Sequence, residues 1–262
     1  MKYSLSAFLL TLAFNAPLAA QEDSPAAPTK KAASTDKADT PAVKMWQKFS
    51  NLPKEKRTAF SNQLTKSQNF LAQKRVFDAL QELDKLDKIF PDHPAALNLR
   101  GACYVEIRSF DKANAAFAKV LKFSPDNVNT LFNIAEVEFV TKKWANAHTR
   151  FTELVSKIPE TQKPMLRLCE FKLLLCKLQL KKTDEAKALM EKYDEWDDSP
   201  YYYYSRAAFE YHADNKRQAE NNLREARYVY NNAQILAPWQ DTLVEFGYIR
   251  SFFGQPEDKA EQ

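Results

Sequence analysis

Apolar residues recur along most of the chain at intervals of three and four residues, which is the period of helices that bury one face. This pattern begins at about Met45 and continues to Gly254. Polar and proline-containing stretches interrupt it between successive helical segments. The pattern therefore predicts a series of consecutive helices and an all-α protein.

The helical pattern repeats with a period of 34 residues. Prolines, alanines and large apolar residues keep this period independently of one another. The three series are Pro91, Pro125 and Pro159; Ala79, Ala113 and Ala147; and Leu83, Phe117 and Phe151. Because separate residue classes agree on one period, the sequence predicts a repeat architecture rather than a single closed domain.

Residues 94–127 resemble one repeat of the tetratricopeptide repeat (TPR) family. They carry Gly101, Tyr104, Ala113, Phe117 and Pro125 at that family's positions. The resemblance implies a right-handed TPR-type α-solenoid of antiparallel helix pairs with a C-terminal capping helix. Small residues would let two helices approach closely, and the aromatic residues would fill the space between them. We expect purely structural roles for Ala79, Pro91, Gly101, Tyr104, Ala113, Phe117, Pro125, Ala147, Phe151, Pro159, Ala186 and Ala219.

These anchor residues set the expected boundaries within a solenoid over residues 45–254. The repeats are expected at about 60–93, 94–127 and 128–161, then in divergent form at 162–199 and 200–233, with a cap at 238–253 and a polar tail at 255–262. Ala186 follows Ala147 by 39 residues, so five residues are inserted between them. The insertion lies either in the loop 159–164 or in a lengthened helix over 165–180.

Residues 1–20 have the pattern of a secretory signal peptide, with a basic start at Lys2, an apolar stretch over 5–14 and a small-residue end. This stretch is shorter than the roughly 20 residues that span a bilayer, although an uncleaved N-terminal anchor is the alternative. Because no cysteine precedes Cys103, we do not expect a lipoprotein. Residues 21–44 are rich in Ala, Pro, Ser, Thr and Lys, which predicts a disordered tether. We therefore expect an exported protein, periplasmic or secreted, with no transmembrane span after signal cleavage.

Composition narrows the range of functions. Three glycines in 262 residues cannot form a glycine-rich phosphate loop, and a formal charge of +4 is too balanced to indicate nucleic-acid binding. Cys103, Cys169 and Cys176 lack the spacing of a metal or redox site and are expected to be buried thiols. We interpret His93 as a solvated turn residue, and Glu82 and Asp84 as parts of solvated helix faces. The sequence thus predicts no enzyme, no catalytic residues, no metal and no cofactor.

In TPR proteins the first helices of successive repeats line a concave groove that holds a peptide or protein segment. The resemblance places these residues in such a groove: Leu64, Gln68, Leu71, Asn98, Ala102, Val105, Phe132, Glu136, Phe139, Tyr201, Tyr204, Ala208 and Tyr211. The partner-binding residues that we select from them are Gln68, Asn98, Phe132, Glu136, Phe139, Tyr201, Tyr204 and Tyr211. Phe132 and Phe139 lie seven residues apart and share one helical face, but they could instead pack between adjacent repeats.

Two further segments leave alternatives open. The four tyrosines of 201–204 surround a helical turn, so either they serve an interface or two of them pack inward and two lie at the surface. The helix expected over 165–180 is apolar on most sides, which favours burial over contact with a partner or a second copy.

These observations favour an exported scaffold that binds a protein or peptide segment, in a cell-envelope assembly, secretion or pilus-type complex. A TPR subclass clamps acidic C-terminal peptides with lysines and asparagines, but Leu64 and Gln68 stand at the matching positions here. An apolar or mixed segment is therefore the expected ligand. The alternative function is a small-ligand or glycan binder that uses the tyrosines. A homo-oligomer is compatible with either function.

Overall fold

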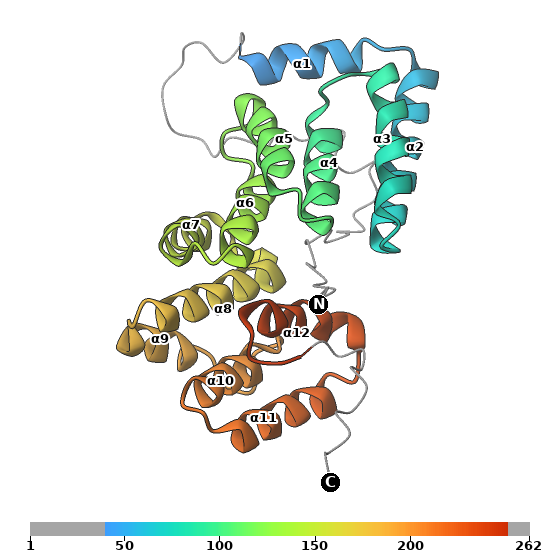
Figure 1. The fold of residues 1–262 in the computed structure, drawn as a ribbon. Coiled ribbons are helices and arrows are strands. Elements are labelled where there is room, and N and C mark those ends of the chain that lie inside the picture. Colours follow the sequence, from blue (N-terminus) through green and yellow to red (C-terminus); the bar gives the residue numbers. More distant parts are fainter. Residues whose placement is uncertain (1–39, 251–262) are drawn as a thin grey trace. The chain divides into compact units, whose positions relative to one another are not determined.

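The computed structural model describes residues 40–250, and every regular element among them is a helix (Figure 1). The expected signal peptide at 1–20, the tether residues 21–39 and the tail at 255–262 lie outside the described residues. The chain divides into two compact units, of which the first ends at Thr130 and the second begins at Leu131. Among residues 40–250, none of the helices combines the length and the apolar character needed to cross a membrane.

The N-terminal unit is built from helices that pack on one another in chain order. Its helices are α1 (Pro41–Ser50), α2 (Lys54–Ala72), α3 (Val76–Ile89), α4 (Pro94–Glu106) and α5 (Phe110–Phe123). Helix α2 packs on α3, α3 on α4 and α4 on α5, while α1 contacts α5. The expected tether is too long at its C-terminal end, because α1 already begins at Pro41. The Thr40 side chain caps this helix by accepting the Val43 N–H.

The C-terminal unit continues the same arrangement. Its elements are α6 (Val128–Val140, which begins in the first unit), α7 (Trp144–Lys157), the short 3₁₀ helix η3 (Glu160–Gln162), α8 (Lys163–Gln179), α9 (Thr183–Met190), α10 (Tyr201–His212), α11 (Lys216–Val229) and α12 (Ala233–Phe246). Helix α7 packs on α8, α8 on α9 and on α10, and α10 on α11. The rings of Phe132 and Phe139 in α6 contact Phe151 in α7 at 6.1 and 6.2 Å.

The turn inside each helix pair has the same backbone conformation. One residue per turn takes a left-handed φ of 58–60°, and these residues are Lys74, Arg108, Lys142, Lys181 and Asp214. The next residue then donates its N–H to a carbonyl of the first helix, as Lys143 does to Glu138 at 2.8 Å. This hydrogen bond closes the C-terminal motif that commonly ends helices. The repeat is therefore visible in the backbone as well as in the sequence.

The expected repeat positions take the structural roles that the sequence predicts. The five alanines Ala79, Ala113, Ala147, Ala186 and Ala219 are all 0% exposed, as are Phe117 and Phe151. Tyr104 is half-buried. Pro91, Pro125 and Pro159 are exposed and follow the ends of α3, α5 and α7 by two residues. The buried alanines and phenylalanines therefore lie where the helices pack on one another.

The insertion before Ala186 lies mainly in a longer helix. Helix α8 has 17 residues, whereas the equivalent α6 has 13. The remaining inserted residue lengthens the connection that contains η3. Four residues add about one helical turn, so α8 presents one more turn to its neighbours than α4 or α6 does. Burial of α8 is confirmed, since 13 of its 17 residues are buried.

The cap helix differs from its expected bounds of 238–253. Helix α12 begins at Ala233, where the Asn232 side chain accepts the Gln234 N–H at 2.9 Å, and it ends at Phe246. Gly247 then takes a φ of 100°, which favours glycine and stops the helix. Pro238 lies inside the helix rather than at its start. Proline at the first helical position was a reasonable expectation, but the asparagine cap before it sets the true start.

His93 is buried, which corrects the expectation of a solvated turn residue. It is 5% exposed, and its Nδ1 accepts the Ala95 N–H at 3.2 Å and so caps α4. Four aromatic rings surround its ring at 4.6–6.0 Å, namely Trp46, Phe49, Phe60 and Phe90. Burial lowers the pKa of His93 to about 4.

Glu82 is also buried, at 6% exposure, whereas Asp84 is exposed as expected. The Glu82 carboxylate accepts hydrogen bonds from Lys85 and Gln63 and lies 3.1 Å from Lys66 Nζ. The hydrogen bond from Lys85 is the largest cause of its lowered pKa. The Glu82 side chain therefore joins α2 to α3 rather than facing water.

Gly101 gives the first testable prediction. A Cβ atom at this position would lie 2.3 Å from Phe117 Cε1, so the α4–α5 pair can be this close only with glycine there. We expect Gly101→Ala to lower the free energy of unfolding by about 1–2 kcal/mol, because overpacking against a ring this close costs about 2–3 kcal/mol while alanine gains about 1 kcal/mol of helix propensity. Denaturant unfolding measures this. Adding Phe117→Leu should recover part of the loss, and an unchanged stability of Gly101→Ala would show that the contact is not limiting.

His93 predicts a pH dependence of stability. Its folded pKa of about 4 lies below the ordinary 6.5, so the unfolded chain binds the proton more readily between these pH values. Stability is then complete above pH 6.5 and falls as pH decreases to 4, by up to about 3 kcal/mol. The His93→Asn variant keeps a capping side chain without the titration. The stability difference between the native chain and this variant should change by that amount over the window, and a constant difference would contradict the assignment.

Candidate partner-binding site

The structure does not bring the predicted groove residues together as an open surface. Phe132 and Phe139 are 1% exposed, Glu136 is 4% exposed, and Tyr201 and Tyr204 are 0% exposed. These five residues are wrong as partner-binding residues, because a partner cannot reach them. Of the four consecutive tyrosines, two are buried while Tyr202 and Tyr203 remain half-exposed, which confirms the alternative of two inward and two outward.

The other three predicted residues have different surroundings. Gln68 is exposed on α2. Asn98 is half-buried on α4, where its Oδ1 accepts a hydrogen bond from Thr130 Oγ1 at 3.1 Å. Tyr211 is half-buried at the end of α10. Gln68 and Asn98 belong to the N-terminal unit and Tyr211 to the C-terminal unit, so the described structure supports no single groove that joins the three.

Helix α12 is the element that covers the first helices of the C-terminal unit. The Phe246 ring contacts Phe139 of α6 at 6.0 Å and Trp144 of α7 at 5.3 Å. About two turns earlier, Trp239 contacts Phe171 of α8 at 5.4 Å and Tyr204 of α10 at 5.8 Å. The chain's own last helix therefore takes the place where the resemblance put a partner.

A buried charge cluster joins the same helices. Lys172 of α8 lies between Glu136 of α6 at 3.0 Å and Glu245 of α12 at 3.5 Å, and all three side chains are at most 5% exposed. The Lys172 Nζ also lies 4.6 Å from the centre of the Phe139 ring. Two carboxylates facing one ammonium leave an excess negative charge if both are ionised.

The pKa values of both carboxyl groups in this cluster are raised. Burial raises the pKa of Glu245 to about 8, against the lowering effect of Lys172 and with a further raising effect of Glu136. Burial also raises the pKa of Glu136. The two carboxyls therefore hold on to a proton at higher pH than an isolated carboxylate does, and this lowers the excess negative charge around Lys172.

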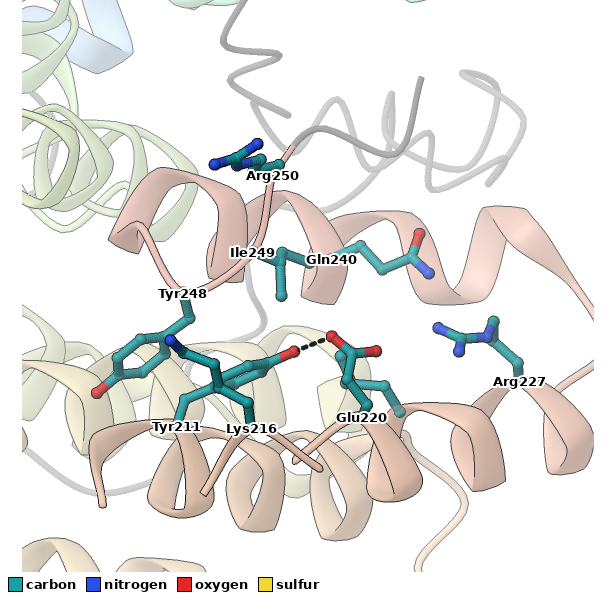
Figure 2. A pocket seen from close by; sticks show the side chains of 9 residues that line it. Tyr211, Lys216, Glu220, Arg227, Gln240, Tyr248, Ile249 and Arg250 are labelled. Atoms are coloured by element: carbon teal, nitrogen blue, oxygen red, sulfur yellow. Dashed lines mark hydrogen bonds between the residues drawn. The ribbon is translucent and has the colours of Figure 1, made fainter. Parts of the chain in front are cut away.

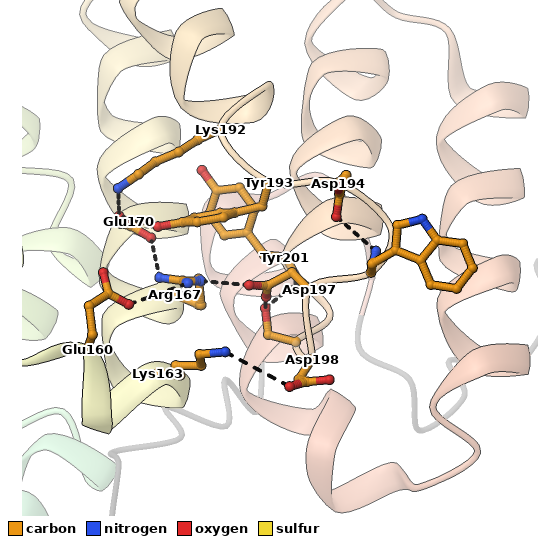
Figure 3. A network of polar contacts seen from close by, with 12 residues as sticks. Glu160, Lys163, Arg167, Glu170, Lys192, Tyr193, Asp194, Asp197, Asp198 and Tyr201 are labelled. Carbon is orange, nitrogen blue, oxygen red and sulfur yellow. Dashed lines mark hydrogen bonds and ion pairs between the residues drawn. The ribbon is translucent and has the colours of Figure 1, made fainter.

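A second polar network fixes the connection between α9 and α10 (Figure 3). The Arg167 Nε donates to Asp197 Oδ2 at 3.2 Å, and its guanidinium lies 3.7 Å from the Tyr193 ring centre. Glu170, which is 0% exposed, accepts a hydrogen bond from Tyr193 Oη at 3.0 Å. The network holds residues 191–200 against α8. Because α10 begins directly after this segment, the network also positions the helices that form the open site.

The open site is a cleft of about 500 Å³ on the C-terminal unit (Figure 2). Helix α11 supplies four of its residues at positions i, i+4, i+7 and i+11, which is the spacing of one helix face. The lining residues are Tyr211 from α10; Lys216, Glu220, Leu223 and Arg227 from α11; Gln240 from α12; and Tyr248, Ile249 and Arg250 after α12.

Contacts within the cleft hold its aromatic wall. The rings of Tyr211 and Tyr248 stack at 5.4 Å with an interplanar angle of 21°. The Tyr211 hydroxyl donates a hydrogen bond to Glu220 (Figure 2). Burial and this carboxylate both raise the pKa of Tyr211, so its hydroxyl keeps its proton and remains a donor. Tyr211 is the one predicted partner-binding residue that lines this cleft.

The cleft combines apolar surface with hydrogen-bond donors. Aromatic and aliphatic surface lies beside the guanidinium, ammonium and amide donors of Arg227, Lys216 and Gln240, as in many peptide-binding sites. Across residues 40–250, no group of three His, Cys, Asp or Glu side chains could hold a metal ion. The cysteines are free and buried as expected, and burial raises the pKa of the Cys103 and Cys176 thiols to about 12.

Comparison with known proteins identifies the fold. No protein-family model and no curated protein matches the chain. Among solved structures, pilF of Pseudomonas aeruginosa is 18% identical with a TM-score of 0.53, over 74% of this chain and 97% of that one. A tetratricopeptide repeat protein from Parabacteroides merdae is 19% identical with a TM-score of 0.53, over 76% of this chain and 78% of that one. This chain has the TPR fold.

Within the TPR fold, α6, α8 and α10 are first helices of their repeats, and α7, α9 and α11 are the companion helices. Helix α12 contacts α6, α8 and α10 through the rings and the charge cluster described above. The cleft lies beside α12, where Gln240 lines it, and against the companion helix α11. Sequence reasoning missed the cleft because it considered only first helices. The spacing of Lys216, Glu220, Leu223 and Arg227 was the signal that could have shown it.

The buried charge cluster predicts how α12 responds to pH. A folded pKa of Glu245 above its ordinary 4.5 means that the folded chain retains the proton, so its stabilising effect is complete below pH 4.5 and is lost as pH rises to 8. Glu245→Gln replaces the protonated acid by a neutral amide. The stability of this variant relative to the native chain should increase from pH 4.5 to 8 and then level off in denaturant unfolding.

The control for this prediction is Glu153→Gln, which changes an exposed carboxylate on α7. Its stability relative to the native chain should stay constant over the same range. If the stability of Glu245→Gln relative to the native chain is also constant over this pH range, the prediction is wrong. Burial beside Lys172 and Glu136 then does not raise the pKa of Glu245.

Proposed function

We propose that the protein is an exported scaffold for protein–protein interaction and that it holds a segment of a partner protein in the cleft between α11 and α12. The TPR fold supplies helical surfaces that bind other chains without catalytic groups. The observation that carries the proposal is the cleft itself, which opens on a framework of packed helices and combines apolar, aromatic and hydrogen-bonding surface.

The framework around the cleft is rigid. Leu223 at its floor is 3% exposed, and the Tyr230 hydroxyl at the end of α11 donates to the Ser199 carbonyl at 2.6 Å. The Tyr201 hydroxyl donates to the Leu189 carbonyl at 2.8 Å and so ties α10 to α9. A preformed site loses little conformational freedom on binding, which favours affinity from a short segment.

The cleft has the composition of a peptide site rather than of a flat contact. Tyrosine rings and Ile249 offer contact area, while Gln240 and Arg227 can donate hydrogen bonds to main-chain carbonyls of a bound segment. The alternative of a glycan site on the four tyrosines has lost its support, because Tyr201 and Tyr204 are sealed in the core.

The cellular setting is part of the same proposal. The signal pattern at 1–20 and the polar composition of 21–39 support export and a tethered position in the cell envelope. An assembly, secretion or pilus-type complex of the envelope is the setting that we propose. After export, the helical repeats would hold a partner segment near the membrane from which the chain was released.

The test is crosslinking in native cells followed by identification of the protein captured. Ile249→Asp and Gln240→Asp place a carboxylate in the cleft and should reduce capture of the native partner at least about tenfold, which corresponds to about 1.4 kcal/mol. N-terminal sequencing of the scaffold protein itself, recovered with its partner, should give a sequence that begins at Gln21. Both substitutions affect half-buried positions, so circular dichroism must first show that the variants keep native helicity.

The matched control is Thr152→Asp, which introduces the same charge at an exposed position of the companion helix α7. It should capture the partner as the native chain does. Equal capture by the native chain and by both cleft variants would refute the proposed site, and a chain that starts at Met1 would refute export by signal cleavage.

A further inference from the structure

Helix α11 carries a row of arginines that have no acidic partner among residues 40–250. Arg217, Arg224 and Arg227 stand at positions i, i+7 and i+10, which brings them to one face of the helix. None of the three has a carboxylate at ion-pair distance within residues 40–250; the Arg224 guanidinium donates instead to the Asn221 amide oxygen. By contrast, four other arginines each pair with an acid: Arg75 just before α3, Arg100 in α4, Arg150 in α7 and Arg167 in α8.

These arginines surround a hollow that continues from the cleft. The hollow measures about 540 Å³ and is lined by Arg217, Glu220, Asn221, Arg224 and Arg227. All five residues belong to α11, and because Glu220 and Arg227 line the cleft as well, the cleft and this open hollow adjoin as one shallow depression along the face of that helix. We call this depression the α11 channel.

The charge of the α11 channel is strongly one-sided. The three arginines Arg217, Arg224 and Arg227 line it, whereas Glu220 is the one acid among the lining residues. Lys216 also lines it but lies 3.5 Å from Asp214. Glu220 is itself engaged by the Tyr211 hydroxyl. The whole chain has 38 basic and 34 acidic residues, so this excess is a local feature and not a consequence of overall charge.

We infer that the α11 channel binds an acidic segment of a partner protein, with its carboxylates on the arginine row and an apolar side chain in the cleft beside Ile249. The inference rests on the proposed function and gives the chemical class of the partner. Unpaired guanidinium groups are suited to carboxylates, to which they donate paired hydrogen bonds. Arg217 and Arg227 are ten positions apart, which corresponds to about 15 Å along the helix axis. About five residues of an extended chain would span that distance.

A protein segment fits the channel better than other polyanions. Leu223 and Ile249 make one end of the channel apolar. The phosphate groups of a nucleic acid would not cover that apolar surface, whereas an apolar side chain of a protein segment would. The inference also revises the expectation of an apolar or mixed ligand, which considered only Leu64 and Gln68 on a first helix and not the companion helix α11.

The experiment measures binding of a synthetic probe to the full chain. The probe is a fluorescein-labelled peptide of about eight residues that alternates glutamate with serine and ends in one phenylalanine. Arg217→Gln combined with Arg224→Gln should weaken its Kd at least about tenfold at low ionic strength. Added salt should also weaken the binding of the probe to the native chain, because salt at 0.1 M screens exposed charges over distances of about 10 Å.

The matched control removes the same charge from the companion helix of another repeat. Lys119→Gln combined with Lys122→Gln neutralises two exposed lysines of α5 and should leave the Kd unchanged. A second control probe has lysine in place of glutamate, and it should not bind. Equal affinity of the arginine double variant and the native chain overturns the inference.

Two other occupants are also tested. If a single-stranded oligonucleotide binds as tightly as the peptide with the same dependence on Arg217 and Arg224, the site is a general polyanion site and the inference is wrong. Residues 251–262 contain Glu257, Asp258 and Glu261. If neutralising these three acids tightens peptide binding at least about tenfold, the chain's own C-terminal segment is the occupant and the inference is again wrong.

Failure of this inference can be distinguished from failure of the proposed function. If the native partner is lost with Ile249→Asp but captured normally by the arginine double variant, the cleft binds a partner that is not acidic. If capture is normal in both variants, the proposed function fails and the inference fails with it.

Discussion

The docking of α12 decides which surfaces of the C-terminal unit are available. Trp239 and Phe246 insert aromatic rings among α6, α7, α8 and α10, and Glu245 meets Lys172 in the same interface. Large aromatic side chains contribute most of the stabilisation in such contacts, because each removes a large apolar area from water. The helix that seals the first-helix face also forms one wall of the cleft against α11. Closing one surface and creating another are therefore two results of the same packing.

Helix α8 makes this arrangement possible because it is both long and buried. It carries Arg167, Glu170 and Lys172 into the interior, where a charge without a partner would cost several kcal/mol. Each charge meets partners from another segment: Asp197 and Tyr193 for the first two, and Glu136 with Glu245 for the third. These contacts need not add net stability, but they admit only one arrangement of neighbours. The walls of the cleft are fixed by that arrangement.

Much of the fold could be predicted from the sequence because TPR packing depends on small residues at fixed spacing. Gly101 and the buried alanines mark where two helices approach, and no other residue type fits those places equally well. The tertiary position of α12 could not be predicted in this way. An amphipathic pattern shows that one face is buried, but it does not show which element covers it. Phe139 was therefore placed in a groove when it lies under a helix more than 90 residues away in the chain, and Phe132 when it packs against Phe151. His93 and Glu82 were misjudged for a similar reason, since their polarity suggested solvent while their neighbours come from other helices.

Amide hydrogen exchange of the full chain, with and without the crosslinked native partner, tests most directly whether α12 closes one surface and leaves the other open. The account predicts that the amides of 236–246 exchange as slowly as those of α8 in the free protein. It also predicts that the partner adds protection at 216–227 and 248–250. Fast exchange of α12 in the free protein, together with partner-induced protection at 132–139, would contradict it.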